Sequence, residues 1–360
     1  MNEYIASSPS LSAHDADRSS SRPSGGITAP PIAVMDPPDA GAAAPAAVPF
    51  HRLGRAHESH RWWRPLLTLL VAGAVYGVIL VVLLVAFVVV AILPGGEAVA
   101  QAFMSFELDM ADPVFQFATL LSLIALIPAC LVGVRFGGGR PVGTLFSVTG
   151  RMRWGLIGRS TVLALVVIVA SMLVAAPFGI GTPLSAPTVD DHTVIALVIA
   201  LLLVPFQAAA EELAFRGLLP QVIGGWLRHP AWAYLLPVPF FVIGHDYSWV
   251  GLIDIAVFAI AMGVLTHRSG GLELAIGLHV VNNSLVFALA AFGMVDLNAT
   301  EVGAITVAAS VATTIVFVAL ALWRLPRWES AGRRTAAGAP AAVTRQAAAS
   351  DEPGTEGIVR

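Results

Sequence analysis

The stretch TVIALVIALLLVPFQAAAEELAFRGLLP, residues 193–220, decides the fold class of this chain. Its first half is apolar enough to enter a lipid bilayer, where about 20 such residues in a helix span the hydrocarbon core. Its second half places Glu211, Glu212 and Arg216 in the continuation of the same apolar run. Because an ionisable side chain at membrane depth is energetically costly, these three residues are candidates for function.

The composition extends this interpretation to the whole chain. Of its 360 residues, 57% are hydrophobic and 12% are charged, and the mean hydropathy is +0.80. Soluble globular domains carry about twice that share of charged residues, so these values favour a protein built into a membrane. The single cysteine, Cys130, excludes an intrachain disulfide and a cysteine metal site. We expect contacts with the lipid bilayer and none with nucleic acid.

Apolar segments of nearly membrane-spanning length recur between residues 65 and 325. Together they predict an all-α fold, a polytopic transmembrane bundle of about eight helices. The fifth and sixth are short, which indicates that this pair does not cross the whole bilayer. The eight segments lie at 65–93, 115–134, 156–178, 193–216, 231–246, 249–266, 272–294 and 302–324.

The segments that connect these helices alternate in charge. Arg135 and Arg140, for example, lie in one loop, whereas Asp190 and Asp191 lie in the next. Arginine-rich loops are retained in the cytoplasm. The alternation therefore predicts a multi-pass protein of the plasma membrane with both termini in the cytoplasm.

The two ends of the chain differ from the apolar region. Residues 1–60 and 329–360 are rich in Ala, Pro, Ser and Gly and show no apolar periodicity, which predicts disordered cytoplasmic tails. The N-terminus has no basic segment followed by an apolar run, so we expect no cleaved signal peptide. The first hydrophobic helix would then direct membrane insertion.

Helical geometry separates the two adjacent glutamates. Glu212 and Arg216 are four residues apart on one face, in the favourable order for an ion pair. Glu211 is rotated by about 100° from Glu212 and about 140° from Arg216. Glu211 therefore lacks the same partner and is the candidate reactive carboxylate. In the alternative interpretation, both acids only hold neighbouring helices together.

Three further polar residues lie in later apolar segments. His279 and Asn283, in GLHVVNNS, share a helix face, where both could donate hydrogen bonds to one developing oxyanion. His245 follows PVPFFVIG, a helix loosened by Pro237 and Pro239. Taken alone, His279 and Asn283 are equally typical of hydrogen bonds between helices, and His245 of a position at the membrane interface.

Other ionisable residues in this half have more ordinary interpretations. Asp254 could orient a histidine or pair with an arginine, and the sequence does not choose between these. His267 and Glu273 lie beside Arg268 in a predicted turn, so we expect them at the interface.

The candidate residues do not lie level in an ideal helix bundle. Glu211 and His245 are each 17 residues from Arg228, whereas His279 is only 11 residues from Arg268. At 1.5 Å per residue, the difference is about 9 Å. An early end of the fourth helix, or a turn of the short fifth and sixth helices inside the bilayer, would close this gap.

The order of these motifs resembles one known family. Glu211-Glu212-xxx-Arg216, Phe241-xxx-His245 and His279-xxx-Asn283 follow one another on consecutive hydrophobic segments. This triple resembles the CPBP intramembrane proteases, which include CAAX prenyl endopeptidases and bacterial Abi or bacteriocin-immunity proteins. The resemblance covers roughly 193–292 and marks it as a catalytic core. The first three helices (61–192) and the eighth helix (293–328) lie outside it.

The resemblance implies a role for each motif residue. Glu211 would be the general base, with His245 assisting, while His279 and Asn283 would form an oxyanion hole. Glu212 and Arg216 would support them. The implied enzyme is a membrane-embedded endopeptidase that hydrolyses a peptide bond of a membrane-associated protein or peptide with a glutamate-activated water.

The resemblance leaves the metal open. The family is often labelled metalloprotease, and Glu211, His245 and His279 could ligate zinc. However, the HExxH signature is absent, and HESH at 57–60 has the wrong spacing. We favour glutamate-dependent hydrolysis without a required metal.

A non-catalytic interpretation of the same cluster remains. In it, the chain is a non-proteolytic immunity or scaffold protein that binds a partner through the intramembrane polar residues. A transporter would also contain buried charges. However, the motif set shows no inverted repeat between the two halves of the chain.

Overall fold

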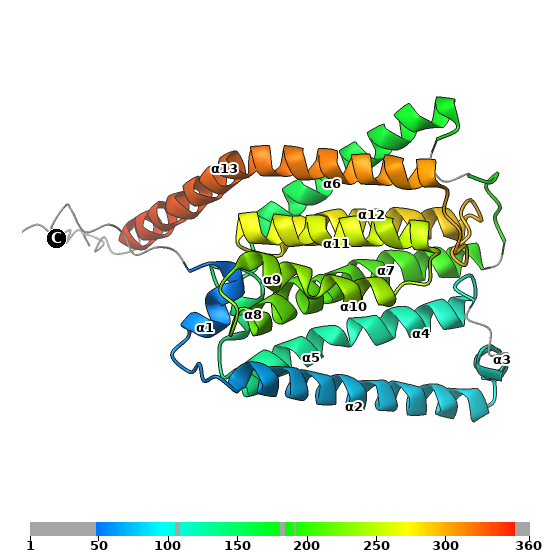
Figure 1. Cartoon of the computed structure of the whole chain (residues 1–360), viewed down its shortest axis with the longest axis horizontal. Helices are drawn as coiled ribbons and strands as arrows, with labels where there is room; N and C mark the ends of the chain where they lie inside the picture. The colour runs from blue at the N-terminus through cyan, green and yellow to red at the C-terminus, as the bar shows by residue number, and fades with distance from the viewer. Residues whose placement is uncertain (1–47, 105–108, 181–183, 191, 350–360) are drawn as a thin grey trace, which may run out of the picture. The chain divides into compact units, whose positions relative to one another are not determined.

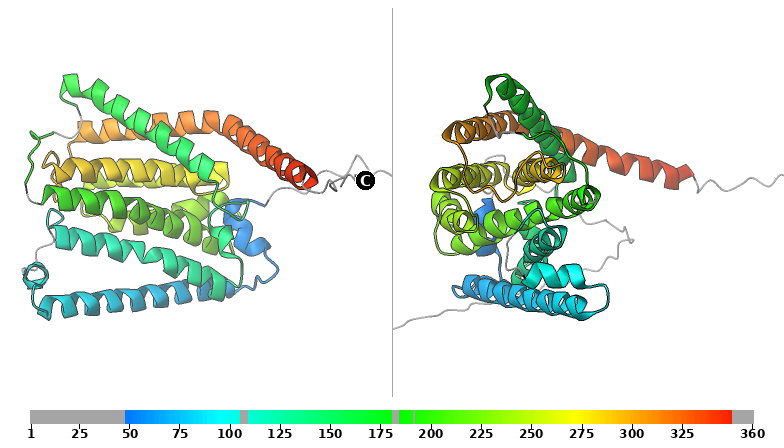
Figure 2. Two further views of the ribbon diagram at one scale, coloured as in Figure 1. Left: turned by 180° about the vertical axis from the view of Figure 1, so that it is seen from behind. Right: turned by 90° about the vertical axis from the view of Figure 1, so that its right-hand side faces the viewer.

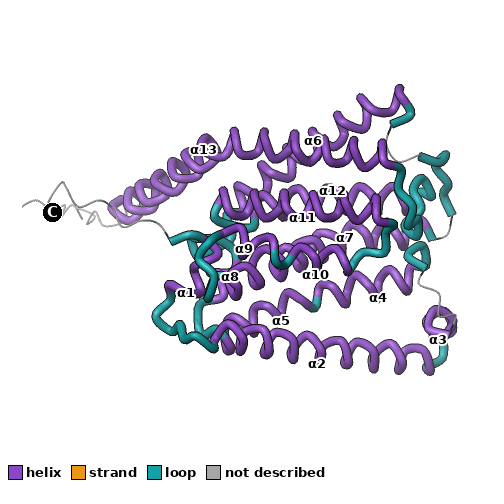
Figure 3. The backbone as a smooth tube through the Cα atoms, viewed as in Figure 1, coloured by secondary structure: helices purple, strands orange, loops and turns teal. Residues whose placement is uncertain are grey.

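The fold was analysed in a computed structural model that describes residues 48–104, 109–180, 184–190 and 192–349. Within those ranges every regular element is a helix, apart from one isolated bridge between Ser147 and Gly271 (Figure 3). Among the described residues, seven helices are long and apolar enough to cross a membrane, and Pro230–Ile243 is a shorter apolar helix. The predicted polytopic helical bundle is confirmed.

The helices follow the predicted apolar segments closely (Figure 1). The first three spans are α2 (Arg64–Ile92), α4 (Pro113–Ile124) with α5 (Leu126–Val132) and the π-helical turn η2 (Gly133–Gly137), and α6 (Trp154–Ala175). The fourth span joins α7 (Thr193–Glu212), the π-helical turn η5 (Leu213–Leu218) and α8 (Leu219–Ile223). After it come α9 (Pro230–Leu235), α10 (Val238–Ile243), α11 (Trp249–Ser269), α12 (Glu273–Ala291) and α13 (Ala304–Ala349).

The predicted short pair is only half confirmed. The fifth segment is short and is broken between α9 and α10, where Pro237 cannot continue the helix. The sixth segment, α11, has 21 residues and is long enough to cross. Its predicted range stopped at residue 266, but the helix continues through His267 and Arg268 to a C-terminal cap at Gly270 in the left-handed conformation.

Both predicted tails are shorter than expected. Residues 48–60 contain η1 (Phe50–Arg52) and α1 (Leu53–Ala56), and Phe50 is buried. Arg52 Nη1 donates to Gly224 O at 2.6 Å, which ties this segment to the end of α8. At the other end, α13 continues as a helix to Ala349. The remaining parts of both predicted tails, 1–47 and 350–360, lie outside the described residues.

The fourth span and α12 lie at the centre of the bundle. Helix α12 packs against α7 on one side and α6 on another, while α4 covers another part of α7 (Figure 2). A buried apolar cluster that includes Leu274, Leu278 and Phe317 joins α6, α11, α12 and α13. This packing fixes α7 and α12, which carry most of the candidate residues.

The connecting loops lie at two opposite ends of the bundle (Figure 1). At one end, Asn298 Nδ2 donates to Asp109 Oδ1 at 2.7 Å, so two acidic loops touch. At the other end, the loop after α5, which contains the short 3₁₀ helix η3 (Val142–Leu145), contacts the turn before α12 through the Ser147–Gly271 bridge. We call the second end the basic end. That it faces the cytoplasm stays a prediction.

Candidate active site

The two glutamates lie where the fourth span changes its helical geometry. Glu212 is the last residue of α7, and the π-helical turn η5 follows it directly. Such turns are rare within helices and are frequent at functional sites. Gly217 lies in this turn, and a Cβ there would be 3.4 Å from Leu272 Cδ1. The turn therefore brings the fourth span into close contact with the start of α12.

This contact explains why the candidate residues are level. Leu272 lies against Gly217, and α7 and α12 run in opposite directions. Glu211 is six residues before Gly217, and His279 is seven residues after Leu272, so the two fall at similar depth. The predicted 9 Å gap does not arise, because His279 lies 2.8 Å from Glu212 Oε1 and 3.7 Å from Glu211 Oε2. The fourth helix does not end early, since it continues to Ile223.

Glu212 is fully buried and has two partners. His279 Nδ1 donates to Glu212 Oε1 at 2.8 Å, and Arg216 Nη1 lies 3.2 Å from the same oxygen. The predicted Glu212–Arg216 ion pair is therefore present. The guanidinium carbon of Arg216 also lies 4.1 Å from the centre of the Phe241 ring. Carboxylate and aromatic face together stabilise a cation that is 3% exposed.

Glu211 points away from Arg216, as helical phase predicts. Gln207 Nε2 donates to Glu211 Oε1 at 2.6 Å. The other oxygen, Oε2, lies 3.7 Å from His279 Nε2 and has no hydrogen-bond partner among the described residues. Glu211 is thus a nearly buried carboxylate, 7% exposed, with one oxygen held and one available.

His279 and Asn283 complete a continuous polar network. Because Nδ1 of His279 donates to Glu212, its Nε2 is free to accept, and Asn283 Nδ2 donates to it at 3.2 Å. Asn283 Nδ2 also donates to Gln207 Oε1 at 3.2 Å. The network therefore runs from Glu212 through His279, Asn283 and Gln207 to Glu211. We call these five residues, with Arg216, the interior network.

His245 lies beside this network without a described hydrogen bond to it. Its Nδ1 donates to Phe241 O at 2.8 Å, one helical turn earlier. The Phe241 ring lies 4.8 Å from the His245 ring and 6.4 Å from the His279 ring, measured between centroids. The structure thus brings Glu211, Glu212, Arg216, His279 and Asn283 into direct contact, and it places His245 across an aromatic ring.

One site residue, Gln207, is absent from the sequence-based prediction, and another, Phe241, is named there without a role. Gln207, 4% exposed, bridges Glu211 and Asn283. It is a polar residue four positions before Glu211 in an apolar helix, and this spacing was the signal that could have revealed it. Phe241 appears in the sequence only as part of a motif. Its ring proves to contact Arg216 and both histidines.

The residues that could hold a metal are not grouped as ligands in the part of the chain that the structure describes. Among the described residues, no group of three or more His, Cys, Asp or Glu side chains is placed to hold a metal ion. The ligand set considered from the sequence, Glu211, His245 and His279, is therefore not assembled. Both histidines use Nδ1 for a hydrogen bond within the protein.

The remaining ionisable residues lie outside the interior network and contact other parts of the bundle. Asp254 of α11 lies within hydrogen-bonding reach of Ser310 of α13. Glu273, predicted at the interface, is instead fully buried in an ion pair with Arg153, whose Nη2 lies 2.7 Å from Glu273 Oε2. That pair anchors the buried start of α12. The lone Cys130 is also buried.

Comparison with known proteins finds a family model that matches part of the chain. Residues 192–285 match the family model described as "Type II CAAX prenyl endopeptidase Rce1-like". The match confirms the resemblance that the three motifs carry, and it includes Glu211, Glu212, Arg216, His245, His279 and Asn283.

A curated bacterial protein also matches part of the chain. The uncharacterized protein YyaK of Bacillus subtilis (strain 168) is 25% identical to this chain over 192 residues. The alignment covers 50% of this chain and 64% of YyaK, so the chain spans less than two thirds of that relative's length. No solved structure matches the chain.

Proposed function

We propose that this chain is a membrane-embedded endopeptidase in which Glu211 activates a water molecule for attack on a peptide bond. The observation that carries the proposal is the state of the Glu211 carboxylate. One oxygen is held by Gln207, while the other is buried, is unpaired among the described residues and lies 3.7 Å from His279 Nε2. A fixed carboxylate with one available oxygen suits a general base.

The proton balance of the reaction can be assigned to the same residues. Glu211 takes one proton from water as the resulting hydroxide bonds to the carbonyl carbon of the peptide. When the carbon–nitrogen bond breaks, Glu211 returns that proton to the leaving amine. The carboxylate therefore ends each cycle unchanged.

The oxyanion is assigned to His279 and Asn283. Both lie on one face of α12, and Asn283 Nδ2 carries two hydrogens, which could turn from their partners within the network toward a substrate oxygen. His279 would donate from Nε2 in its doubly protonated form, while its Nδ1 keeps the hydrogen bond to Glu212. Preorganised donors of this kind stabilise charge that develops in the transition state.

His245 is assigned an assisting role. Its Nδ1 donates to the Phe241 carbonyl, so in the neutral ring Nε2 is the basic nitrogen. A water molecule between His245 Nε2 and Glu211 would be polarised from both sides. Glu212 and Arg216 are positioning residues, because they orient His279 and balance charge within the site.

We infer that hydrolysis needs no metal, since the acid, the base and the oxyanion donors are all supplied by side chains. The substrate would be a membrane-associated protein or peptide, because the site lies within the spans Thr193–Ile223 and Glu273–Ala291. The family match supports a CAAX-type endopeptidase in general terms.

Replacement of one carboxylate tests the proposal. Glu211→Gln keeps the size of the side chain and removes the base, so we expect cleavage to fall by about 1,000-fold or more. Membrane peptides would be compared by mass spectrometry between cells with the wild type, Glu211→Gln and the control Glu301→Gln. Glu301 is an exposed glutamate outside the site.

The same comparison separates the non-catalytic alternative. The proposal requires peptides that disappear in Glu211→Gln cells and remain in Glu301→Gln cells. Unchanged peptides, together with partner binding that survives Glu211→Gln, would instead support an immunity or scaffold role.

A further inference from the structure

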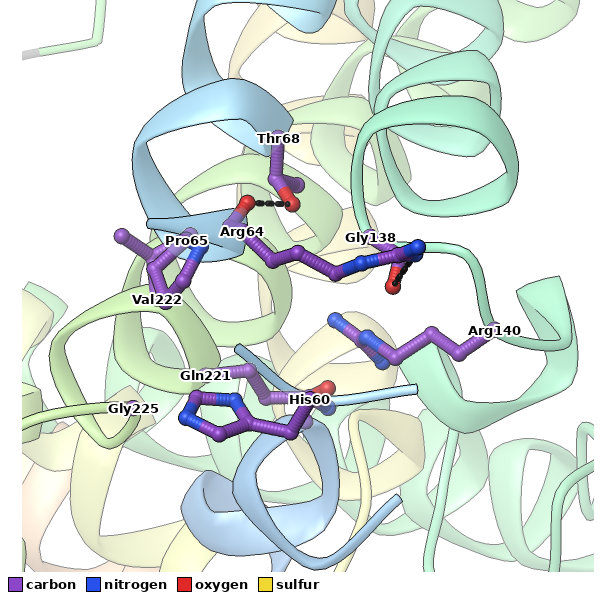
Figure 4. Close-up of a pocket in the computed structure, with 10 residues that line it drawn as sticks. His60, Arg64, Pro65, Thr68, Gly138, Arg140, Gln221, Val222 and Gly225 are labelled. Atoms are coloured by element: carbon purple, nitrogen blue, oxygen red, sulfur yellow. Dashed lines mark hydrogen bonds between the residues drawn. The ribbon is translucent and has the colours of Figure 1, made fainter. Parts of the chain in front are cut away.

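A second polar site lies at the basic end, away from the interior network. It is a small cleft between the start of α2, the loop after η2 and the end of α8 (Figure 4). Its enclosed volume is about 20 Å³, on the order of one water molecule. The polar lining residues include His60, Arg64, Thr68, Arg140 and Gln221. None of the described residues that line it is acidic.

Arg140 is the central feature of this cleft. Its side chain is 5% exposed, and its guanidinium donates to the Thr144 hydroxyl. No described carboxylate forms an ion pair with it. Burial lowers the pKa of Arg140 to about 10, so the side chain remains charged near neutral pH. The fold thus buries a cation and supplies only a neutral partner.

The neighbours add positive charge. Figure 4 shows the Arg64 side chain extending toward the cleft opposite Arg140, and Arg64 Nη1 donates to Gly138 O at 3.1 Å. Arg64 Nε is buried without a hydrogen-bond partner among the described residues. Arg55 Nη1 donates to His60 Nε2 at 2.7 Å. Two guanidinium groups therefore face one small space, and a third lies beyond its rim.

Such an arrangement is unfavourable without an anion. A buried charge is costly unless it is paired, and two like charges across one cleft raise that cost further. Arginine is well suited to phosphate because its planar fork of donors can bind two oxygens at once.

The place of the cleft indicates where the anion would come from. Arg64 is the first residue of a predicted membrane span, so the cleft lies at the end of that span, near the level of lipid headgroups. Basic pockets between transmembrane helices are suited to anionic headgroups. Because the enclosed space is small, a phosphate would insert one or two oxygens there and leave its ester chain outside.

We propose that the cleft between Arg64 and Arg140 binds a phosphate group, presented by an anionic phospholipid of the surrounding bilayer. Gln221 adds a second feature that fits such a headgroup. It is 2% exposed, its Nε2 donates to Thr144 O at 2.7 Å, and its Oε1 has no partner among the described residues. That oxygen can accept a hydrogen bond from a headgroup hydroxyl.

Lipid binding by the purified full chain tests this proposal. Detergent-solubilised wild type would be titrated with phosphatidylglycerol, with phosphatidylcholine and with inorganic phosphate, and bound lipid counted by native mass spectrometry. We expect Arg140→Gln to weaken phosphatidylglycerol binding about 10- to 100-fold, the usual effect of losing a charged hydrogen-bond partner. Arg135→Gln is the matched control, because Arg135 is an exposed arginine of the same basic segment.

The outcomes separate the two sources of phosphate. Selective phosphatidylglycerol binding that is lost in Arg140→Gln and kept in Arg135→Gln supports the proposal. Binding of inorganic phosphate alone, lost in the same variant, keeps the phosphate site and overturns the lipid source. Equal losses in both variants, or none, would overturn the site. Arg64→Gln, at a partly exposed position, provides a second variant should Arg140→Gln fold poorly.

Discussion

Arg216 and Arg140 are both buried arginines, but only the charge of Arg216 is paired with a carboxylate among the described residues of the protein. Arg216 is 3% exposed, lies 3.2 Å from the Glu212 carboxylate and is covered by the Phe241 ring. Arg140 is 5% exposed and has a hydroxyl as its side-chain partner. The first charge is balanced from within the protein. The second is balanced by no described side chain.

The difference follows from position in the bundle. Arg216 lies inside the fourth span, where hydrocarbon offers no counter-charge, so the chain must supply its own. Arg140 lies beyond the end of the span Pro113–Gly137, where headgroups and ions are within reach. A buried cation without an ion pair inside the protein therefore indicates an anion site only at the membrane interface, where a headgroup or ion can balance its charge.

Of these variants, Glu212→Gln should lower stability the most. It removes the carboxylate that pairs with Arg216 and leaves that arginine, like Arg140, without an ion pair among the described residues. Removing one partner of a buried ion pair costs about 3 to 5 kcal/mol. We expect the free energy of unfolding to fall by that amount in a denaturant titration followed by helical signal. Glu211→Gln, one residue away, should change it far less, since Glu211 forms no ion pair with Arg216 in this structure.

A double variant checks the cause of that loss. Glu212→Gln combined with Arg216→Gln removes the unpaired charge, and we expect it to recover a large part of the lost stability. No recovery would mean that Glu212 stabilises the protein mainly through His279 and not through Arg216. By the same reasoning, Arg140→Gln removes an unpaired charge and should leave the lipid-free protein no less stable.

Two glutamines on the fourth span allow a second, smaller test. Gln207 and Gln221 are 4% and 2% exposed, but only Gln207 belongs to the interior network. Gln207→Leu frees Glu211 Oε1 and one Asn283 hydrogen, so we expect kcat to fall by about tenfold, the effect of one lost hydrogen bond. KM should change little.

Gln221→Leu is the control for that result. It removes an equally buried amide from the basic end, so we expect it to alter phosphatidylglycerol binding and to leave kcat within about twofold. Rates would be measured in membranes on a peptide identified by the Glu211→Gln comparison. A fall in kcat in both variants would show that the effect comes from the helix and not from the network.

The sequence was sufficient for those features that depend on local periodicity. Apolar run lengths predicted the spans, and 3.6-residue phase predicted that Glu212 would pair with Arg216 while Glu211 would not. The ion pair forms although Arg216 lies within the π-helical turn η5, which begins directly after Glu212.

Features that depend on distant contacts could not be predicted. The depth of His279 is set by Leu272 against Gly217 and by the buried Glu273–Arg153 pair, none of which is local in sequence. Phe50 illustrates the same limit, because it lies in a segment with the composition of a tail and is nevertheless buried in the bundle. Composition is a property of the segment alone, whereas burial depends on its tertiary contacts with the rest of the protein.

Removal of metal ions should have the smallest effect on cleavage. It tests whether the side chains of the interior network are enough for hydrolysis without a metal. Each histidine has one nitrogen committed, His245 to the Phe241 carbonyl and His279 to Glu212. The described residues also offer no three-ligand group. We therefore expect treatment with EDTA or phenanthroline to leave cleavage within about twofold, since side chains supply every proton transfer. Loss of cleavage that zinc alone restores would contradict this and would require Glu211 to act as a ligand, with His245 turned from Phe241 toward the network. Glu212→Gln would then lower zinc affinity through His279, as loss of an outer-shell partner does by about 10- to 100-fold.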